Sequence, residues 1–210
     1  RDPGGAHLAP MERVLDRLAR DPPRALIYLS STSVYGDRDG AWVDEATPIA
    51  PGSPWGRMRA ELEQLVLGQR FTPAAVVRIP EIYGPGRGPF AKVRTGTARR
   101  IIKRGQFFSR IHRDDIATVL ETSIRYPNPG AVYNVCDDEP APPQDVLEYA
   151  ARLLDVDPPP EVAFETADLS PMVRSFYSES KRVSNRRIRE ELGVELAFPD
   201  YQTGLNALLS

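Results

Sequence analysis

The sequence has a single cysteine, Cys136, which excludes an internal disulfide framework and is typical of a reducing, cytoplasmic environment. It has no apolar run near the roughly 20 residues that a membrane helix needs, so no membrane segment is expected. Basic and acidic residues nearly balance, at 27 and 29, without the basic excess of most nucleic-acid-binding proteins. The two histidines, His7 and His112, belong to no Cys/His cluster, so no metal site is expected. A small molecule is therefore the expected partner.

Stretches of helical and strand character alternate along the 210 residues. Helices are predicted at about 10–20, 53–67, 114–125, 142–154, 184–193 and 200–209. Strands are predicted at about 25–30, 74–79, 106–111, 131–135 and 161–164, with polar loops at 31–52 and 83–88. The first two strands lack polar alternation, as strands buried on both faces do. The pattern predicts an α/β fold with a parallel sheet.

Local signals mark the ends of the predicted helices. Pro10 suits the first helical position, and Ser53 is a typical N-cap. Asp114-Asp115 and Ser184 are expected to cap two later helices, and Gly193 is expected to end the second of these.

Hydroxyl side chains follow the first predicted strand, at Ser30, Ser31, Thr32 and Ser33. Ligands of open α/β sheets bind beyond the carboxyl ends of the strands. A serine there can donate a hydrogen bond to a substrate oxygen. The alternative is that these hydroxyls only satisfy backbone groups of the loop.

Six motifs occur in order along the chain: STSVYG (31–36), DEATP (44–48), SPWGRMRAE (53–61), RIPEIYGPGR (78–87), IHRDDIA (111–117) and YNV (133–135). This series resembles the extended short-chain dehydrogenase/reductase family, the NAD-dependent epimerase/dehydratases, over nearly the whole chain. The forms RIHRDD and KRVSN look most like an atypical subgroup. The resemblance implies a Rossmann-like doubly wound parallel sheet with a small mixed α/β substrate lobe. Residues 1–86 would belong to the NAD(P)-binding domain and 87–210 mainly to the lobe, with 106–136 partly returning to the first domain.

The same resemblance implies NAD or NADP as cofactor and a nucleotide-sugar-like or other polar carbonyl or alcohol substrate. The residues that it places at the cofactor are Ser30, Ser31, Arg59, Ile79, Pro80, Glu81 and Ile82. Those that it places at the substrate are Thr32, Arg87 and Arg110. The positions of the family's catalytic residues are Ser31, Trp55 and Arg59.

Two of these positions depart from the family, which has a Tyr and, four residues later, a Lys. Here they hold Trp55 and Arg59. An indole has no usable titrating proton, so Trp55 cannot act as a general acid or base. Arg59 keeps the positive charge that would hold a ribose or phosphate, but it cannot be deprotonated. Tyr35 offers a phenol nearby, although packing within the turn is its expected role.

The sequence also lacks the G-x-x-G-x-x-G turn that holds a dinucleotide pyrophosphate, despite 15 glycines. A βαβ unit takes roughly 30 residues, so we expect some 60 or more residues of the cofactor domain to be missing before Arg1. The adenosine and pyrophosphate site would lie in that part.

Three hypotheses follow. The first is an epimerase/dehydratase or oxidoreductase with altered acid/base groups. The second is a non-catalytic NAD(P)-binding sensor or scaffold protein. In the third, this chain alone binds no cofactor. A homodimer formed through the helices at 10–20 and 53–67 is a further expectation from the resemblance.

Overall fold

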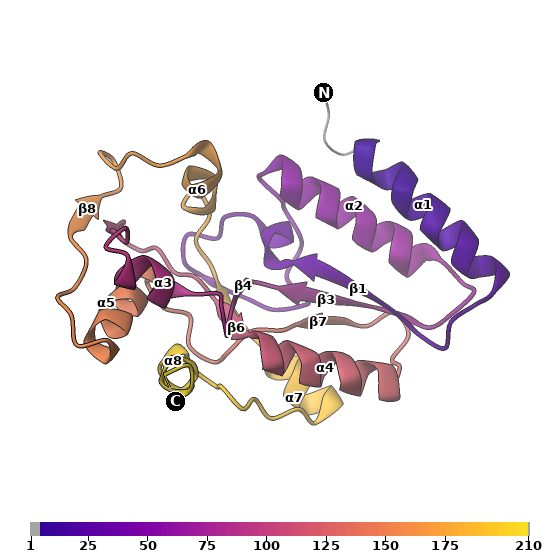
Figure 1. Cartoon of the computed structure of the whole chain (residues 1–210). Coiled ribbons are helices and arrows are strands. Elements are labelled where there is room, and N and C mark those ends of the chain that lie inside the picture. Colours follow the sequence, from indigo (N-terminus) through magenta and orange to yellow (C-terminus); the bar gives the residue numbers. More distant parts are fainter. Residues whose placement is uncertain (1–4, 210) are drawn as a thin grey trace.

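The computed structural model describes residues 5–209, and the side chains from residue 8 onward; the His7 side chain therefore lies outside the described part. A parallel sheet forms its centre, in the order β1 (Leu26–Ser31), β3 (Ala74–Ile79), β7 (Val132–Asn134). Helices cover both faces of this sheet (Figure 1): α1 (Gly5–Arg20) and α2 (Pro54–Gly68) on one, α4 (Arg113–Arg125) and α7 (Arg186–Leu192) on the other. The predicted α/β class with a parallel sheet is confirmed.

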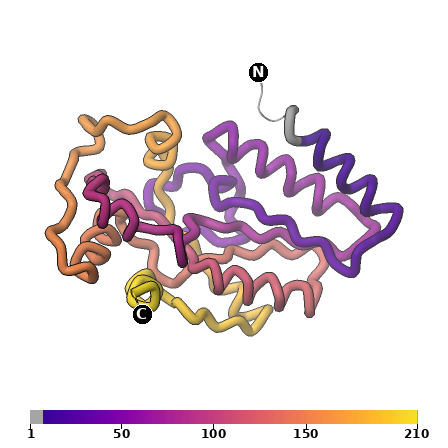
Figure 2. The backbone as a smooth tube through the Cα atoms, viewed as in Figure 1, coloured from indigo at the N-terminus to yellow at the C-terminus, as the bar shows by residue number. Residues whose placement is uncertain are grey.

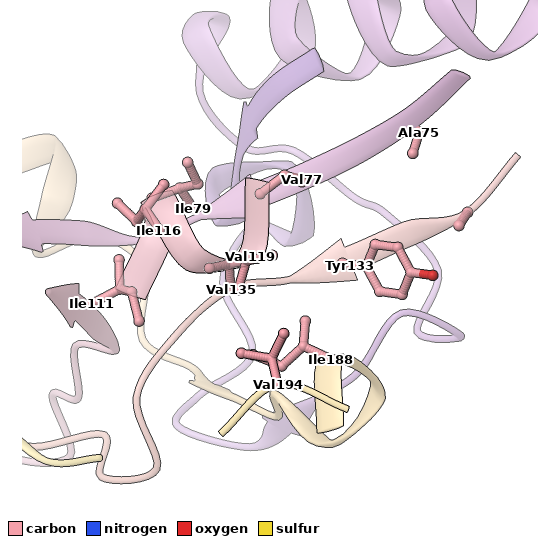
Figure 3. Close-up of a cluster of buried hydrophobic side chains, with 11 residues drawn as sticks. Ala75, Val77, Ile79, Ile111, Ile116, Val119, Tyr133, Val135, Ile188 and Val194 are labelled. Carbon is pink, nitrogen blue, oxygen red and sulfur yellow. The ribbon is translucent and has the colours of Figure 1, made fainter. Parts of the chain in front are cut away.

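The central strand β3 explains why the sheet needs two helical layers. All six of its residues are buried, and successive side chains of a strand point to opposite faces. Ala75, Val77 and Ile79 face the layer of α4 and α7 (Figure 3), where they pack with Val119 and Ile188. Ala74 and Val76 join a second cluster beneath α2 that includes Met58, Leu62 and Val66. Each large aliphatic side chain buried in this way contributes about 1.5–3 kcal/mol.

A smaller lobe extends from the carboxyl end of this sheet. It contains two further parallel pairs, β4 (Glu81–Tyr83) with β6 (Arg110–His112) and β5 (Arg100–Ile102) with β8 (Glu161–Ala163). Its core lies among the helices α3 (Pro89–Arg94), α5 (Pro143–Leu153) and α8 (Tyr201–Ala207). Figure 2 shows the orange segment that includes α5 and β8 running along the outer side of this lobe.

The four remaining elements of the described residues are short. A 3-10 turn, η1 (Thr32–Tyr35), follows β1 directly. The two-residue strands β2 (Trp42–Val43) and β9 (Arg182–Val183) pair in parallel, although they lie about 140 residues apart in the chain. Helix α6 (Pro171–Phe176) precedes β9. The predicted loop at 31–52 therefore contains two regular elements.

Several predicted boundaries are wrong for identifiable reasons. Pro10 lies inside α1, which already begins at Gly5. Neither Asp114 nor Asp115 caps α4, because His112 is the N-cap and its Nδ1 accepts a hydrogen bond from the Asp114 amide at 3.3 Å.

Two more predictions need correction in the second half of the chain. Asn185, not Ser184, occupies the N-cap position of α7, whereas Gly193 ends that helix in the left-handed conformation as expected. The predicted strand at 106–111 is confined to its end, at β6, because the amide of Gln106 turns back to the Lys103 carbonyl. Within residues 5–209, none of the helices combines the length and the apolar character that crossing a membrane requires.

Candidate functional site

The serine-rich segment forms a tight turn at the carboxyl end of β1. Ser31 is the N-cap of η1, and its Oγ accepts a hydrogen bond from the Ser33 amide at 3.2 Å. Gly36 closes the turn with φ of 68°, and a Cβ there would lie 2.1 Å from the Ala50 carbonyl oxygen. Glycine is therefore required at this position. Ser31 Oγ therefore satisfies one backbone amide of the turn, and this bond uses a lone pair of the oxygen, not the hydroxyl proton.

A buried ion pair lies directly behind this turn. The Glu63 carboxylate, on α2, accepts hydrogen bonds from the guanidinium of Arg78, on β3, with Oε2 2.7 Å from Nη2. The hydroxyl of Ser30 donates to Oε1 of the same carboxylate at 2.5 Å. The two charged side chains are only 1% and 7% exposed, and each satisfies the other. Neither charge could remain buried without its partner.

The pair extends into a hydrogen-bonded chain across the sheet. Nη1 of Arg78 donates to the Tyr35 hydroxyl at 2.9 Å, which in turn donates to Oδ1 of Asn134 at 2.8 Å. The backbone amide of Asn134 donates to Oε1 of Glu45 at 2.7 Å. Tyr35 is fully buried, and burial raises the pKa of its phenol. Its proton is therefore held within the protein, which confirms the packing role expected for Tyr35.

The two departures from the family pattern lie on the first turns of α2, which Ser53 caps as predicted. Trp55 is 56% exposed. Arg59 lies over β1, where its Nη1 donates to the Tyr28 hydroxyl at 3.0 Å and to the Leu29 carbonyl at 3.2 Å. Burial raises the pKa of Tyr28, against the influence of Arg59. Neither Tyr28 nor Tyr35 therefore offers a readily ionised phenol.

The structure brings most of the predicted cofactor residues to one edge of the sheet. Ser30 and Ser31, at the end of β1, pair in register with Arg78 and Ile79 of β3. The segment from Pro80 through β4 continues from that point, and α2 brings Arg59 to the neighbouring part of β1. Ser31 and Arg59 thus provide a hydroxyl and a fixed positive charge beside the strand ends.

The predicted substrate residues occupy three different environments. Thr32 is buried in η1, and Arg87 is exposed on the turn after β4. Arg110 is only 3% exposed, and its Nη2 lies 3.6 Å from Oε2 of Glu81. Because Arg110 is buried, its guanidinium has little surface left for a direct contact with substrate.

Sequence reasoning missed the charged residues Glu63 and Asp137. Glu63 is an acidic residue among the apolar positions of α2, and that mismatch was the available signal. Asp137 follows β7, and burial raises its pKa to about 8. Among the described residues, the carboxylate oxygens of Asp137 and Nη1 of Arg110 lack a well-formed hydrogen bond, although the backbone of Glu139 interacts with the carboxylate and acts to lower its pKa. Within residues 5–209, no group of three potential ligand side chains is arranged to hold a metal ion.

Comparison with known proteins identifies the relatives of this chain. The model of the NAD dependent epimerase/dehydratase family matches residues 5–136. Protein YeeZ of Escherichia coli strain K12 is 33% identical over 194 residues, which are 91% of this chain and 65% of YeeZ. The chain thus spans about two thirds of the length of that relative.

Solved structures agree on the fold. A conserved protein of unknown function from Silicibacter pomeroyi is 56% identical with a TM-score of 0.89, over 99% of this chain and 72% of that chain. MoeE5 in complex with UDP-glucuronic acid and NAD is 21% identical with a TM-score of 0.77, over 93% of this chain and 67% of that chain. The second likeness shows the fold alone, and together they confirm the Rossmann-like architecture.

Proposed function

Because the chain belongs to the NAD-dependent epimerase/dehydratase family, we propose that it contributes to a protein that binds NAD or NADP and acts on a nucleotide-sugar-like or other polar carbonyl or alcohol substrate. The observation that carries this proposal is the joint position of Ser31 and Arg59 beside the carboxyl ends of β1 and β3. MoeE5, which shares the fold, is solved with a nucleotide sugar and NAD.

The residues present fit the nicotinamide half of such a cofactor. Arg59 offers its guanidinium to a ribose hydroxyl or a phosphate, and the backbone from Ile79 to Ile82 follows the strand end where ligands of these sheets bind. When bound, a nicotinamide cofactor supplies hydride transfer. This chain supplies the hydroxyls of Ser31 and Thr32, which can orient a substrate oxygen.

Proton transfer is the step for which the usual group is absent. Trp55 cannot exchange a proton, and the phenols of Tyr28 and Tyr35 are held by Arg59 and Arg78. Substrate orientation by Ser31 is therefore better supported than the family's usual acid/base chemistry.

The proposal is tested by titrating the full-length protein with NADH and NADPH in a calorimeter. We expect a micromolar Kd for one of them, and a weaker Kd for Arg59→Ala. The matched control is Arg57→Ala, since Arg57 lies on the same helix but donates to the Gly52 carbonyl. Failure of both cofactors to bind would refute the proposal.

The exposed indole of Trp55 favours a second candidate, a non-catalytic NAD(P)-binding sensor or scaffold. UDP-glucose and UDP-glucuronic acid serve as test substrates with NAD and NADP. Sugar products are followed by chromatography, since an epimerase or dehydratase leaves no net reduced cofactor, and net oxidation is followed by absorbance of the reduced cofactor. A sensor would bind cofactor without turnover, and the double variant Trp55→Tyr/Arg59→Lys would keep that binding. Turnover by the unaltered protein would exclude the sensor.

A further inference from the structure

A segment far along the chain holds the outer side of the serine-rich turn. Residues 179–184, which follow α6, run beside residues 36–43. The Ser180 amide donates to Oδ1 of Asp37 at 2.7 Å, and the Ser180 carbonyl accepts from the amides of Arg38 and Gly40, both at 3.0 Å. We call residues 179–184 the strap. Most of its attachment is backbone hydrogen bonding, continued by the β2–β9 pair.

One charged side chain of the strap reaches the turn itself. Nζ of Lys181 donates to the Gly36 carbonyl at 2.8 Å and to Oε2 of Glu179 at 2.7 Å. Both side chains are nearly buried, at 11% and 12% exposure. Gly36 is the residue that closes the turn begun by Ser31. The chain has only three lysines, and this one donates a hydrogen bond to a backbone carbonyl of the turn.

The carboxylate of the pair faces the other element of the site. A methyl group added at Gly52 would lie 3.8 Å from Oε1 of Glu179, and Gly52 directly precedes Ser53, the N-cap of α2. The pair of Lys181 and Glu179 therefore lies between the end of the serine-rich turn and the start of the helix that carries Trp55 and Arg59.

We propose that Lys181, held by Glu179, is a positioning residue that fixes the serine-rich turn in the conformation that presents Ser31 to ligand. This inference rests on the proposed function for the identity of the ligand, but not for the ordering of the turn. Loss of the ammonium leaves the Gly36 carbonyl and the Glu179 carboxylate without their shared donor, while the backbone bonds of Ser180 stay in place. The consequence is local loosening of the turn rather than unfolding.

The test compares Lys181→Met, Lys181→Arg and Glu179→Gln in the full-length protein, with Lys92→Met as the control at an exposed lysine. Hydrogen exchange of backbone amides, followed by mass spectrometry, reports on residues 31–40. We expect Lys181→Met to raise exchange there at least tenfold, with exchange in α4 unchanged. Lys181→Arg should restore most of the protection, and Lys92→Met should change nothing.

Binding separates positioning from a merely structural role. UDP-glucose is the probe for the substrate side, and NADH and NADPH are the probes for the cofactor. Lys181→Met should weaken UDP-glucose binding at least fivefold and cofactor binding less than twofold. Unchanged exchange at 31–40, exchange raised equally in α4, or unchanged UDP-glucose binding despite a loosened turn would each overturn the inference. If the unaltered protein binds no UDP-glucose, the proposed substrate class fails, and the exchange measurement alone decides on Lys181.

Discussion

The serine-rich turn is supported from two sides in contrasting ways. On its inner side, Glu63 and Arg78 form an ion pair whose side chains are 1% and 7% exposed and whose hydrogen bonds lead to Tyr35. On its outer side, the strap is attached mainly through backbone groups, together with Lys181, which donates to the Gly36 carbonyl, and Arg182, which donates to the Gly40 carbonyl. Loss of Arg78 would strand the Glu63 carboxylate at 1% exposure, whereas loss of Lys181 would leave Glu179 at 12% exposure and the backbone bonds of Ser180 in place. We therefore expect the inner support to govern global stability and the outer one to govern local order.

The strongest test of this contrast is Arg78→Met. It leaves the Glu63 carboxylate buried without its counterion, and removing one partner of a buried pair costs about 3–5 kcal/mol. Urea denaturation of the two proteins gives the difference in unfolding free energy. Arg125→Ala is the matched control, because Arg125 pairs with Glu121 on the exposed surface of α4, where such pairs contribute about 0.5 kcal/mol or less. A loss below about 1 kcal/mol for Arg78→Met would mean that the pair does not govern stability.

Asp137 provides the converse case, a buried carboxyl that forms no salt bridge within the described residues, in contrast to Glu63. Burial raises its pKa to about 8, so the folded protein keeps a proton that the unfolded chain loses near pH 4. The stability that this proton provides is complete below about pH 4 and is lost as the pH rises towards 8, by roughly 1 kcal/mol per pH unit.

Asp137→Asn should remove this dependence, because an amide carries no titrating proton. The measurement is the unfolding free energy of both proteins between pH 5 and pH 9, and the variant should gain relative to the parent as the pH rises. Parallel curves for the two proteins would show that Asp137 ionises normally in the fold.

Much of the sheet region could be predicted because its signals are local. The uninterrupted apolar character of β3 and the Ser53 cap of α2 each lie within a few residues of sequence. The inner support could not be predicted in this way, because Glu63 and Arg78 come into contact only when α2 packs on β3. For the same reason Asp115 was misread as a cap: its carboxylate is buried, where it accepts hydrogen bonds from the amides of Ala197 and Phe198, over 80 residues away.

The site shows the same division between local and distant information. The position of Ser31 at the end of a strand followed from the apolar run just before it, and the structure places it there. The strap could not be predicted, because two-residue strands such as β2 and β9 have no periodicity of their own and exist only as a pair. The family resemblance pointed to Arg59 as the basic residue of the site, whereas Lys181 contacts the turn itself.

The smallest expected effect is a coupling between Tyr35→Phe and Lys181→Met, which tests whether the inner and outer supports stabilise the same turn. Tyr35→Phe removes a hydroxyl that joins Arg78 to Asn134, and we expect it to cost about 1 kcal/mol of unfolding free energy. Tyr35 and Gly36 are neighbours in the chain, so loosening the turn from the outside should also relax the hydroxyl on the inside. The double variant Tyr35→Phe/Lys181→Met should then lose less than the sum of the single variants, by about 0.5 kcal/mol or more.

This double-mutant comparison needs a control pair whose residues lie on different elements and do not interact. Tyr35→Phe with Arg125→Ala provides it, because Arg125 lies at the far end of α4. That control pair should be additive within about 0.3 kcal/mol. If Tyr35→Phe and Lys181→Met are equally additive, the turn transmits nothing between its two sides, and the ion pair and the strap are separate devices. If they couple, then residues from the sheet core and from the segment after α6 jointly fix the hydroxyls of Ser31 and Thr32, and a site of this kind needs both halves of the chain to be folded.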